Sequence, residues 1–276
     1  MRPLLLLLMA ITFTITTHAQ AKTDVKQMSL KGKVKSVKLL ENYRYKKEGK
    51  FTEWGVLYNR QYNFDITGRY TDVIENKADG SFYYKTVYTY LPKEKKAEIT
   101  YVYNEGQKAS KKIWSYNAKG QKTEEQEYTK DGAASWRYTY AYDDKGNMTV
   151  MTGFRPDGTM SSKTTWTYDA KGNMLTYLVE TPGYANSSRK FIYDAKGNMK
   201  EEIWYNGENE VEFRFVRSYD AQGSVIEELK YRGMDDLRDK ITWQFVYDSK
   251  GNWTKRTQFT SDGVDFSKAE RTISYY

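Results

Sequence analysis

Aromatic and polar residues alternate along most of the chain. In the stretch 136–142 (WRYTYAY), a ring stands at every second position, and Arg137, Thr139 and Ala141 stand between the rings. The stretch 241–247 (ITWQFVY) has the same alternation. Successive side chains of a β-strand point to opposite faces of its sheet. The pattern therefore predicts strands that have one aromatic face and one polar face.

The alternation is organised in units of 25 to 28 residues, and an aromatic anchor marks each unit. Most anchors begin a turn sequence such as YDAKGN, which occurs at 168–173 and again at 193–198. Its aspartate can accept backbone hydrogen bonds, and its glycine suits a left-handed backbone position. A second turn lies near the middle of most units, so each unit is predicted to be a β-hairpin. The nine anchors are Phe64, Tyr90, Tyr116, Tyr142, Tyr168, Tyr193, Tyr219, Tyr247 and Tyr275.

A further ring follows the anchor by twelve residues in five units. We expect these rings on the same aromatic face as the anchors, which would leave the sheet half-buried along its whole length. They are Tyr128, Phe154, Tyr205, Tyr231 and Phe259.

The repeat predicts an all-β fold, an antiparallel meander of repeated β-hairpins. Open sheets rarely exceed ~10 strands without curling, so we expect this one to coil into a spiral, solenoid-like sheet with its rings inside. Residues 30–276 would form a single domain, with 30–63 as an N-terminal capping hairpin and 64–276 as about eight repeats. A transmembrane barrel is the rival fold. It would need an apolar outward face, whereas Lys, Arg, Glu, Thr and Ser stand opposite the rings here.

The N-terminus has the pattern of a secretory signal peptide. Arg2 precedes an apolar run at 4–16, and the small residues Ala19 and Ala21 follow it. This pattern predicts a signal peptide at 1–19, cut after residue 19 or 21, and then a flexible polar leader at 20–29. The apolar run is shorter than the ~20 residues that a membrane-spanning helix needs. The protein is therefore expected in the periplasm, on the cell surface or outside the cell.

The composition narrows the chemistry. The chain has no cysteine, and its only histidine, His18, lies in the predicted signal peptide. Disulfides and Ser-His-Asp or Cys-His catalysis are thereby excluded, and structural zinc is disfavoured. We therefore expect no metal and no cofactor. Loss of Arg2 would lower the formal net charge from +8 to +7. The basic residues are spread among acidic ones, so nucleic acid is not an expected partner.

The stretches 136–149 (WRYTYAYDDKGNMT) and 164–177 (TTWTYDAKGNMLTY) resemble the YD repeat of the Rhs/teneurin superfamily. The resemblance covers residues 64–276 and implies β-hairpins that wind into a spiral sheet. Large members of the superfamily wrap dozens of repeats into a shell around a toxin. This chain, with its eight or nine units, instead resembles short exported YD-repeat proteins that lack a toxin tip. The resemblance implies no catalytic residues.

We interpret the protein as a non-catalytic exported module that binds glycan in the cell envelope or outside the cell. Tyrosine and tryptophan rings can stack on the apolar faces of sugars. Two rings break the repeat pattern and are the candidate ligand-binding residues. Trp204 stands at an odd position of its strand, and Tyr184 lies in the long loop 181–188. Polysaccharide is the corresponding partner.

Two alternatives stay open. The first is a structural or protein-interaction component of the envelope, including an inhibitor of a toxin. A spiral sheet would have free edges, and the C-terminal strand 271–276 would be the edge that binds an envelope protein. The second is a glycosidase that uses paired carboxylates. It is less favoured because neighbours on a strand point to opposite faces. The adjacent pairs are Glu124–Glu125, Glu201–Glu202 and Glu227–Glu228.

Overall fold

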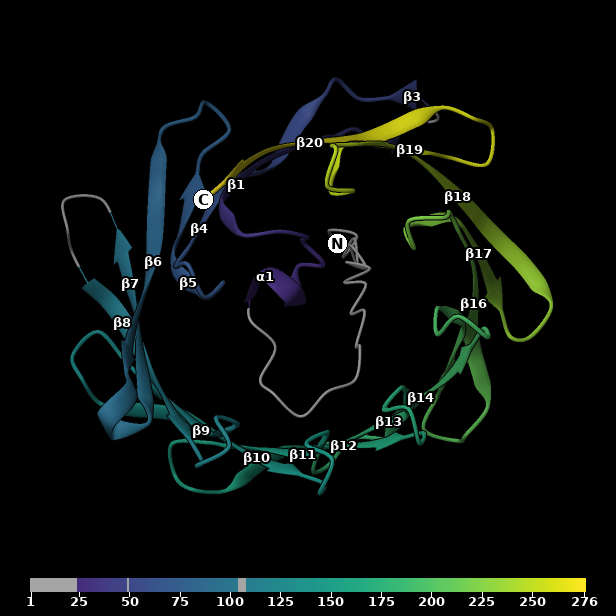
Figure 1. The fold of residues 1–276 in the computed structure, drawn as a ribbon. Coiled ribbons are helices and arrows are strands. Elements are labelled where there is room, and N and C mark those ends of the chain that lie inside the picture. The colour runs from purple at the N-terminus through teal and green to yellow at the C-terminus, as the bar shows by residue number, and fades with distance from the viewer. Residues whose placement is uncertain (1–23, 49, 104–107) are drawn as a thin grey trace.

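The computed structural model describes residues 24–48, 50–103 and 108–276. Eighteen strands form a single antiparallel sheet, which is seen as a ring in Figure 1. The remaining elements are α1 (Asp24–Gln27), the small hairpin of β2 (Lys46–Lys47) and β3 (Lys50–Phe51), and the 3₁₀ turn η1 (Pro92–Glu94). The strands of the large sheet are β1 (Val34–Tyr43), β4 (Gly55–Phe64), β5 (Tyr70–Asn76), β6 (Phe82–Leu91), β7 (Lys96–Tyr103), β8 (Lys108–Tyr116), β9 (Lys122–Tyr128), β10 (Ala134–Tyr142), β11 (Met148–Phe154), β12 (Met160–Tyr168), β13 (Met174–Glu180), β14 (Ser187–Tyr193), β15 (Met199–Tyr205), β16 (Val211–Tyr219), β17 (Val225–Arg232), β18 (Asp236–Tyr247), β19 (Trp253–Phe259) and β20 (Asp265–Tyr275).

The sheet closes on itself. From β4 to β20 each strand pairs with the next strand of the chain, and β1 pairs with both β4 and β20. Val37 on β1 lies opposite Tyr62 on one side and Ile273 on the other. The predicted antiparallel meander is confirmed, but the open spiral is wrong. The fold is a closed barrel of 18 strands.

β-Bulges that recur at the anchors explain why the sheet closes. The pairing register shifts by one residue at most anchors, which is the signature of a β-bulge. A bulge bends its strand and increases the local twist, so repeated bulges curve the sheet steadily in one sense. The shifts occur at Asn63/Phe64, Ser115/Tyr116, Ala141/Tyr142, Thr167/Tyr168, Ile192/Tyr193, Ser218/Tyr219 and Val246/Tyr247.

The seam, where β1 closes the sheet between β4 and β20, lies where the sequence predicted a cap and a free edge. Within the predicted capping hairpin 30–63, β1 is the strand that joins the two ends of the meander. The C-terminal strand pairs with it from Val34 opposite Tyr275 to Tyr43 opposite Ser267. The predicted free edge at 271–276 is therefore wrong, because β20 is paired on both sides.

The repeated turn sequence holds each hairpin in place. Oδ1 of Asp194 accepts hydrogen bonds from the amides of Lys196 and Asn198, each at 2.9 Å. Nδ2 of Asn198 donates to Oδ2 of Asp194, also at 2.9 Å, and these bonds lower the pKa of Asp194. Gly197 adopts a φ of 87°, which strains any residue with a Cβ. The aspartate, the glycine and the asparagine of this turn therefore each have a structural role.

The hydroxyl of an anchor tyrosine can join its unit to the preceding one. The hydroxyl of Tyr168 donates to the carbonyl of Met148 at 2.6 Å, and that of Tyr219 donates to the carbonyl of Met199 at 2.6 Å. In both cases the acceptor lies six residues after the preceding anchor. These contacts explain why the tyrosine and the turn recur together.

The position of α1 identifies the inner wall of the barrel. Figure 1 shows α1 inside the ring of strands. Val25 of α1 belongs to a buried cluster with Val37 and Phe64, against which Tyr62 and Tyr275 pack. Residues directly opposite each other in a sheet share a face. The anchors, and the residues at every second position before them in the same strand, therefore face inward.

The outer wall carries many charged side chains together with apolar ones such as Ile192 and Val246. Ion pairs join neighbouring strands on this wall. Three of the rings that follow an anchor by twelve residues also lie here, each beneath a cationic side chain. The guanidinium of Arg137 lies 4.2 Å from the ring centre of Phe154, and that of Arg214 lies 5.2 Å from Tyr231. The expectation that these rings share the anchors' face is wrong. The outer pairs are Lys111–Glu98, Arg137–Glu124, Lys163–Glu180, Arg214–Glu201, Lys240–Glu227 and Lys255–Glu270.

Part of the predicted leader is ordered. Residues 24–29 fall within the leader predicted at 20–29, yet Asp24–Gln27 form α1 and Val25 is buried against the barrel wall. Oδ2 of Asp24 accepts a hydrogen bond from the amide of Tyr70 at 2.6 Å. The predicted signal peptide 1–19 and residues 20–23 lie outside the described residues. Among the helices that are described, none is long and apolar enough to cross a membrane.

Candidate functional site

Many side chains of the inner wall are partly exposed. Eleven hydrophobic residues are buried in the described part of the chain, and anchors such as Tyr142, Tyr168 and Tyr193 stay partly exposed. Barrels of 16 to 18 strands are too wide for side chains to close, as in porins. The inner wall is therefore a surface that a ligand can reach.

The phenols of the inner wall are neutral and fixed. Burial raises the pKa of Tyr142, Tyr168 and Tyr219 to about 12. Each of them donates its hydroxyl hydrogen to a backbone carbonyl. Their rings present apolar faces and edges at set positions, whereas their polar ends are already bonded.

Tryptophan rings extend this surface. Trp166 on β12 lies 5.9 Å from Tyr177 on β13, measured between ring centres. On β19, Trp253 lies 6.3 Å from Phe245. Such pairs add roughly 0.5–1.5 kcal/mol beyond the area that they bury. The wall is thus a pre-ordered aromatic surface.

Paired charges interrupt the rings at several places besides the pair of Arg60 with Glu75. In the first, Nζ of Lys112 lies 3.0 Å from Glu125, and Nζ of Lys122 lies 2.9 Å from the same carboxylate. The pKa of Glu125 is lowered, because these two ammonium groups outweigh the opposing effect of its burial. Glu125 is therefore held in its ionised form.

In the second, one arginine holds two glutamates. The guanidinium of Arg217 lies 2.9 Å from Glu202 and 2.7 Å from Glu228. Arg217 is 9% exposed, and the two glutamates are 10% and 13% exposed. Buried charges at this spacing depend on each other strongly. In the third, Nη2 of Arg256 lies 2.7 Å from Oε1 of Glu41.

The two predicted ligand-binding residues differ in their surroundings and their exposure. Trp204 faces inward, and its Nε1 donates to Glu202 at 2.7 Å. Arg189 covers this ring at 4.1 Å. Tyr184 is 77% exposed in the loop after β13, and no ring contact joins it to Trp204 among the described residues. Their role in binding a ligand stays a prediction.

The adjacent glutamates point to opposite walls. Glu124 pairs with Arg137 on the outer wall, whereas Glu125 pairs with Lys112 on the inner wall. The same division holds for the other two pairs. Over the part of the chain that the structure describes, no three His, Cys, Asp or Glu side chains gather to hold a metal ion.

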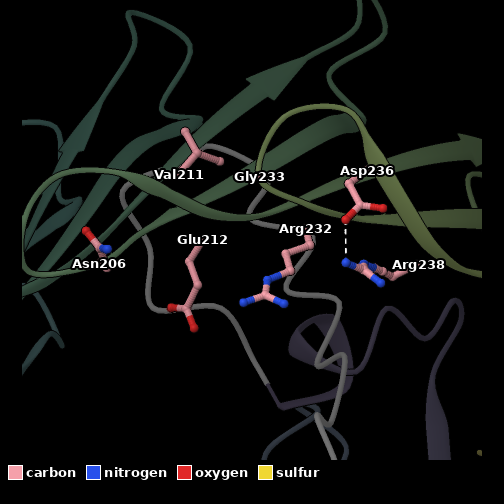
Figure 2. A pocket seen from close by; sticks show the side chains of 7 residues that line it. All are labelled: Asn206, Val211, Glu212, Arg232, Gly233, Asp236 and Arg238. Carbon is pink, nitrogen blue, oxygen red and sulfur yellow. Dashed lines mark ion pairs between the residues drawn. The ribbon is translucent and has the colours of Figure 1, made fainter.

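A second hollow lies among the hairpins of β16, β17 and β18. It encloses about 470 Å³, and Figure 2 shows its charged side chains, with Asp236 paired to Arg238. Both of these side chains are more than half exposed. The hollow offers few apolar contacts, so the inner wall is the better candidate for a binding surface.

Comparison with known proteins finds similar folds but no family for the chain. No protein-family model and no curated protein sequence matches the chain. A porin-like protein from Bacteroides uniformis is similar in structure, with a TM-score of 0.50 and 14% identity over 88% of this chain and 98% of that one. A porin-like protein from Bacteroides vulgatus has a TM-score of 0.35 and 10% identity over 88% of this chain and 98% of that one. A TcdB2-TccC3-Cdc42 complex has a TM-score of 0.35 and 13% identity, and the match covers 82% of this chain but 15% of that chain.

These findings correct two terms of the sequence analysis. The spiral implied by the YD-repeat resemblance is replaced by a closed barrel of 18 strands, a fold similar to that of the porin-like protein from Bacteroides uniformis. The Rhs or YD-repeat assignment and the carbohydrate-binding assignment have no support from the comparisons.

Proposed function

We propose that the protein is a non-catalytic, water-facing barrel of the cell envelope that binds an amphipathic ligand in its lumen. The observation that carries the proposal is the polarity of the two walls. Ion pairs join neighbouring strands of the outer wall, whereas ring-to-ring contacts such as those of Trp166 and Trp253 lie on the inner wall.

The outer wall suits water and not lipid. A barrel that spans a bilayer carries an outward apolar band about 25 Å tall. Here the corresponding surface carries pairs such as Lys163–Glu180 and Lys255–Glu270. Charged side chains on a lipid-facing wall cost roughly 2–4 kcal/mol each at the midplane. We therefore infer that the barrel is surrounded by water, and the predicted signal peptide at 1–19 supports a place in the envelope.

The inner wall suits a ligand with both apolar and polar parts. Rings such as Trp166 and Tyr177 offer apolar faces, and the paired charges between the rings offer polar contacts. A polypeptide segment is a second candidate occupant. The chain's own α1 already docks on this wall through Val25, which packs with Val37 and Phe64.

The proposal predicts saturable binding of a neutral amphipathic dye. Nile red should bind the folded protein at micromolar concentration or tighter, with a blue-shifted emission. The Trp166→Ala variant should bind about fivefold to tenfold more weakly, because one stacking ring is worth about 1 kcal/mol. Fluorescence titration measures both constants.

The matched control is Phe154→Ala, which removes a ring from the outer wall and should leave the affinity unchanged. Flotation with phosphatidylcholine vesicles should leave the protein in the aqueous fraction. Absence of dye binding, equal binding by the Trp166→Ala variant, or flotation with the vesicles would each contradict the proposal.

A further inference from the structure

Arg271 stands on the inner wall of the barrel at its seam. It lies on β20 directly opposite Leu39 of β1. Its guanidinium rests on the ring of Trp253, with 3.6 Å between Cζ and the ring centre. The guanidinium of Arg256, on the neighbouring strand β19, lies 5.3 Å from the same ring. The indole thus holds two guanidinium groups in fixed positions.

Arg271 differs from four other arginines of this wall, each of which has a carboxylate partner. Among the described residues, no carboxylate lies within ion-pair distance of Arg271. The paired arginines are Arg60 with Glu75, Arg189 with Glu202, Arg217 with Glu202 and Glu228, and Arg256 with Glu41.

The site also holds unused hydrogen-bond donors. The Nε atoms of Arg256 and Arg271 are buried, and neither has a hydrogen-bond partner. Glu41 already binds Arg256 and accepts a hydrogen bond from Ser267 at 2.9 Å. One carboxylate therefore faces two guanidinium groups, which leaves one positive charge in excess. Buried donors without partners are rare and costly in folded proteins.

The electrostatics agree with this geometry. Burial lowers the pKa of Arg271 to about 10, and the charge of Arg256 acts in the same direction. The carboxylate of Glu41 and the phenols of Tyr62 and Tyr70 act in the opposite sense, but they do not restore the usual value. A second negative charge at this place would reduce the electrostatic repulsion between the guanidinium groups of the two arginines.

We propose that Arg271 and Arg256, held on Trp253, form an oxyanion site in the lumen that takes a carboxylate or phosphate group of the ligand. Guanidinium groups bind both oxyanions through paired N–H donors. The rings nearby would hold the apolar part of the same ligand. The inference rests on the proposed lumen binding and names the chemical class of its ligand.

The test uses inorganic phosphate and succinate as separate probes, each titrated calorimetrically into the folded protein at low ionic strength. At least one should bind saturably with one site per chain, and the stronger of the two identifies the oxyanion. Arg271→Gln should weaken that binding by about tenfold or more, because a charge-assisted hydrogen-bond pair is lost. Arg137→Gln removes the same charge from the outer wall and should leave binding unchanged.

Thermal unfolding supplies a second readout. The bound anion should raise the melting temperature of the wild type but not that of the Arg271→Gln variant. Without anion the variant should be at least as stable as the wild type, since it loses an unpaired buried charge. No anion binding by the wild type, or equal binding by the Arg271→Gln variant, would overturn the site. Retained Nile red binding in that case would leave the proposed lumen function standing, whereas anion binding without dye binding would reject that function and keep the site.

Discussion

The Val37→Asp substitution is expected to lower the free energy of unfolding by roughly 4 kcal/mol or more. Val37 is fully buried, with 0% of its surface exposed. It lies between Tyr62 and Ile273 at the seam and in the cluster that receives α1. A carboxylate there would lack a partner and would separate the strands that close the ring. Urea unfolding followed by circular dichroism measures the loss.

The neighbouring residue provides the control. Lys38 belongs to the same strand but is exposed on the outer wall. Lys38→Asp should change the free energy of unfolding by less than about 1 kcal/mol. A Val37→Asp variant as stable as the Lys38→Asp variant would show that the seam does not hold the fold together.

The Arg217→Met substitution should cost roughly 3–5 kcal/mol of stability. It removes the guanidinium that Glu202 and Glu228 share and leaves two carboxylates close together on a half-buried wall. Methionine keeps much of the apolar stem, so the loss reports the charge and not the packing. Equilibrium unfolding in urea at pH 7 gives the value.

Arg137→Met removes an arginine from the exposed pair with Glu124 and should cost at most about 1 kcal/mol. In a Glu228→Gln background the cost of Arg217→Met should shrink, because one of the two stranded charges is already gone. Equal losses for Arg217→Met and Arg137→Met would mean that the inner-wall triad contributes no more than a surface pair.

The local structure could be predicted from the sequence because it depends on neighbouring residues. The alternation at 136–142 predicted a strand, and β10 spans Ala134–Tyr142. The turn of Asp194 and Gly197 followed from the conformations that these residue types prefer. Hydrogen bonds within a few residues fix the turn, and the alternation of residue types within one strand marks the strand, so a short stretch of sequence is enough to predict both.

Closure could not be predicted in the same way. It depends on β1 fitting between β4 and β20, which are far apart in the chain.

The bulges also alter which side chains share a face. Counting from Tyr193 placed Trp204 off the inner wall, but the register shift at Ile192/Tyr193 returns it there. The same effect moved Phe154 and Tyr231 to the outer wall. A bulge leaves no clear mark in the alternation, so the sequence misplaced these rings.

The charged part of the site was missed for a related reason. Arg256, Arg271 and Trp253 come from two strands, and only the pairing of β19 with β20 brings them together. The sequence does contain one usable signal. Arg271 stands four residues before the anchor Tyr275, so the period-two alternation places it on the same face as that anchor.

Cross-linking of the seam tests the closed barrel most directly. The chain has no cysteine, so Lys38→Cys and Thr272→Cys introduce the only two thiols. These positions are directly opposite each other on β1 and β20, with Cβ atoms expected about 5 Å apart. A short bismaleimide should join them within one chain, at a yield independent of protein concentration. Two freely reactive thiols with no intramolecular link would show that the sheet is open and would contradict the barrel.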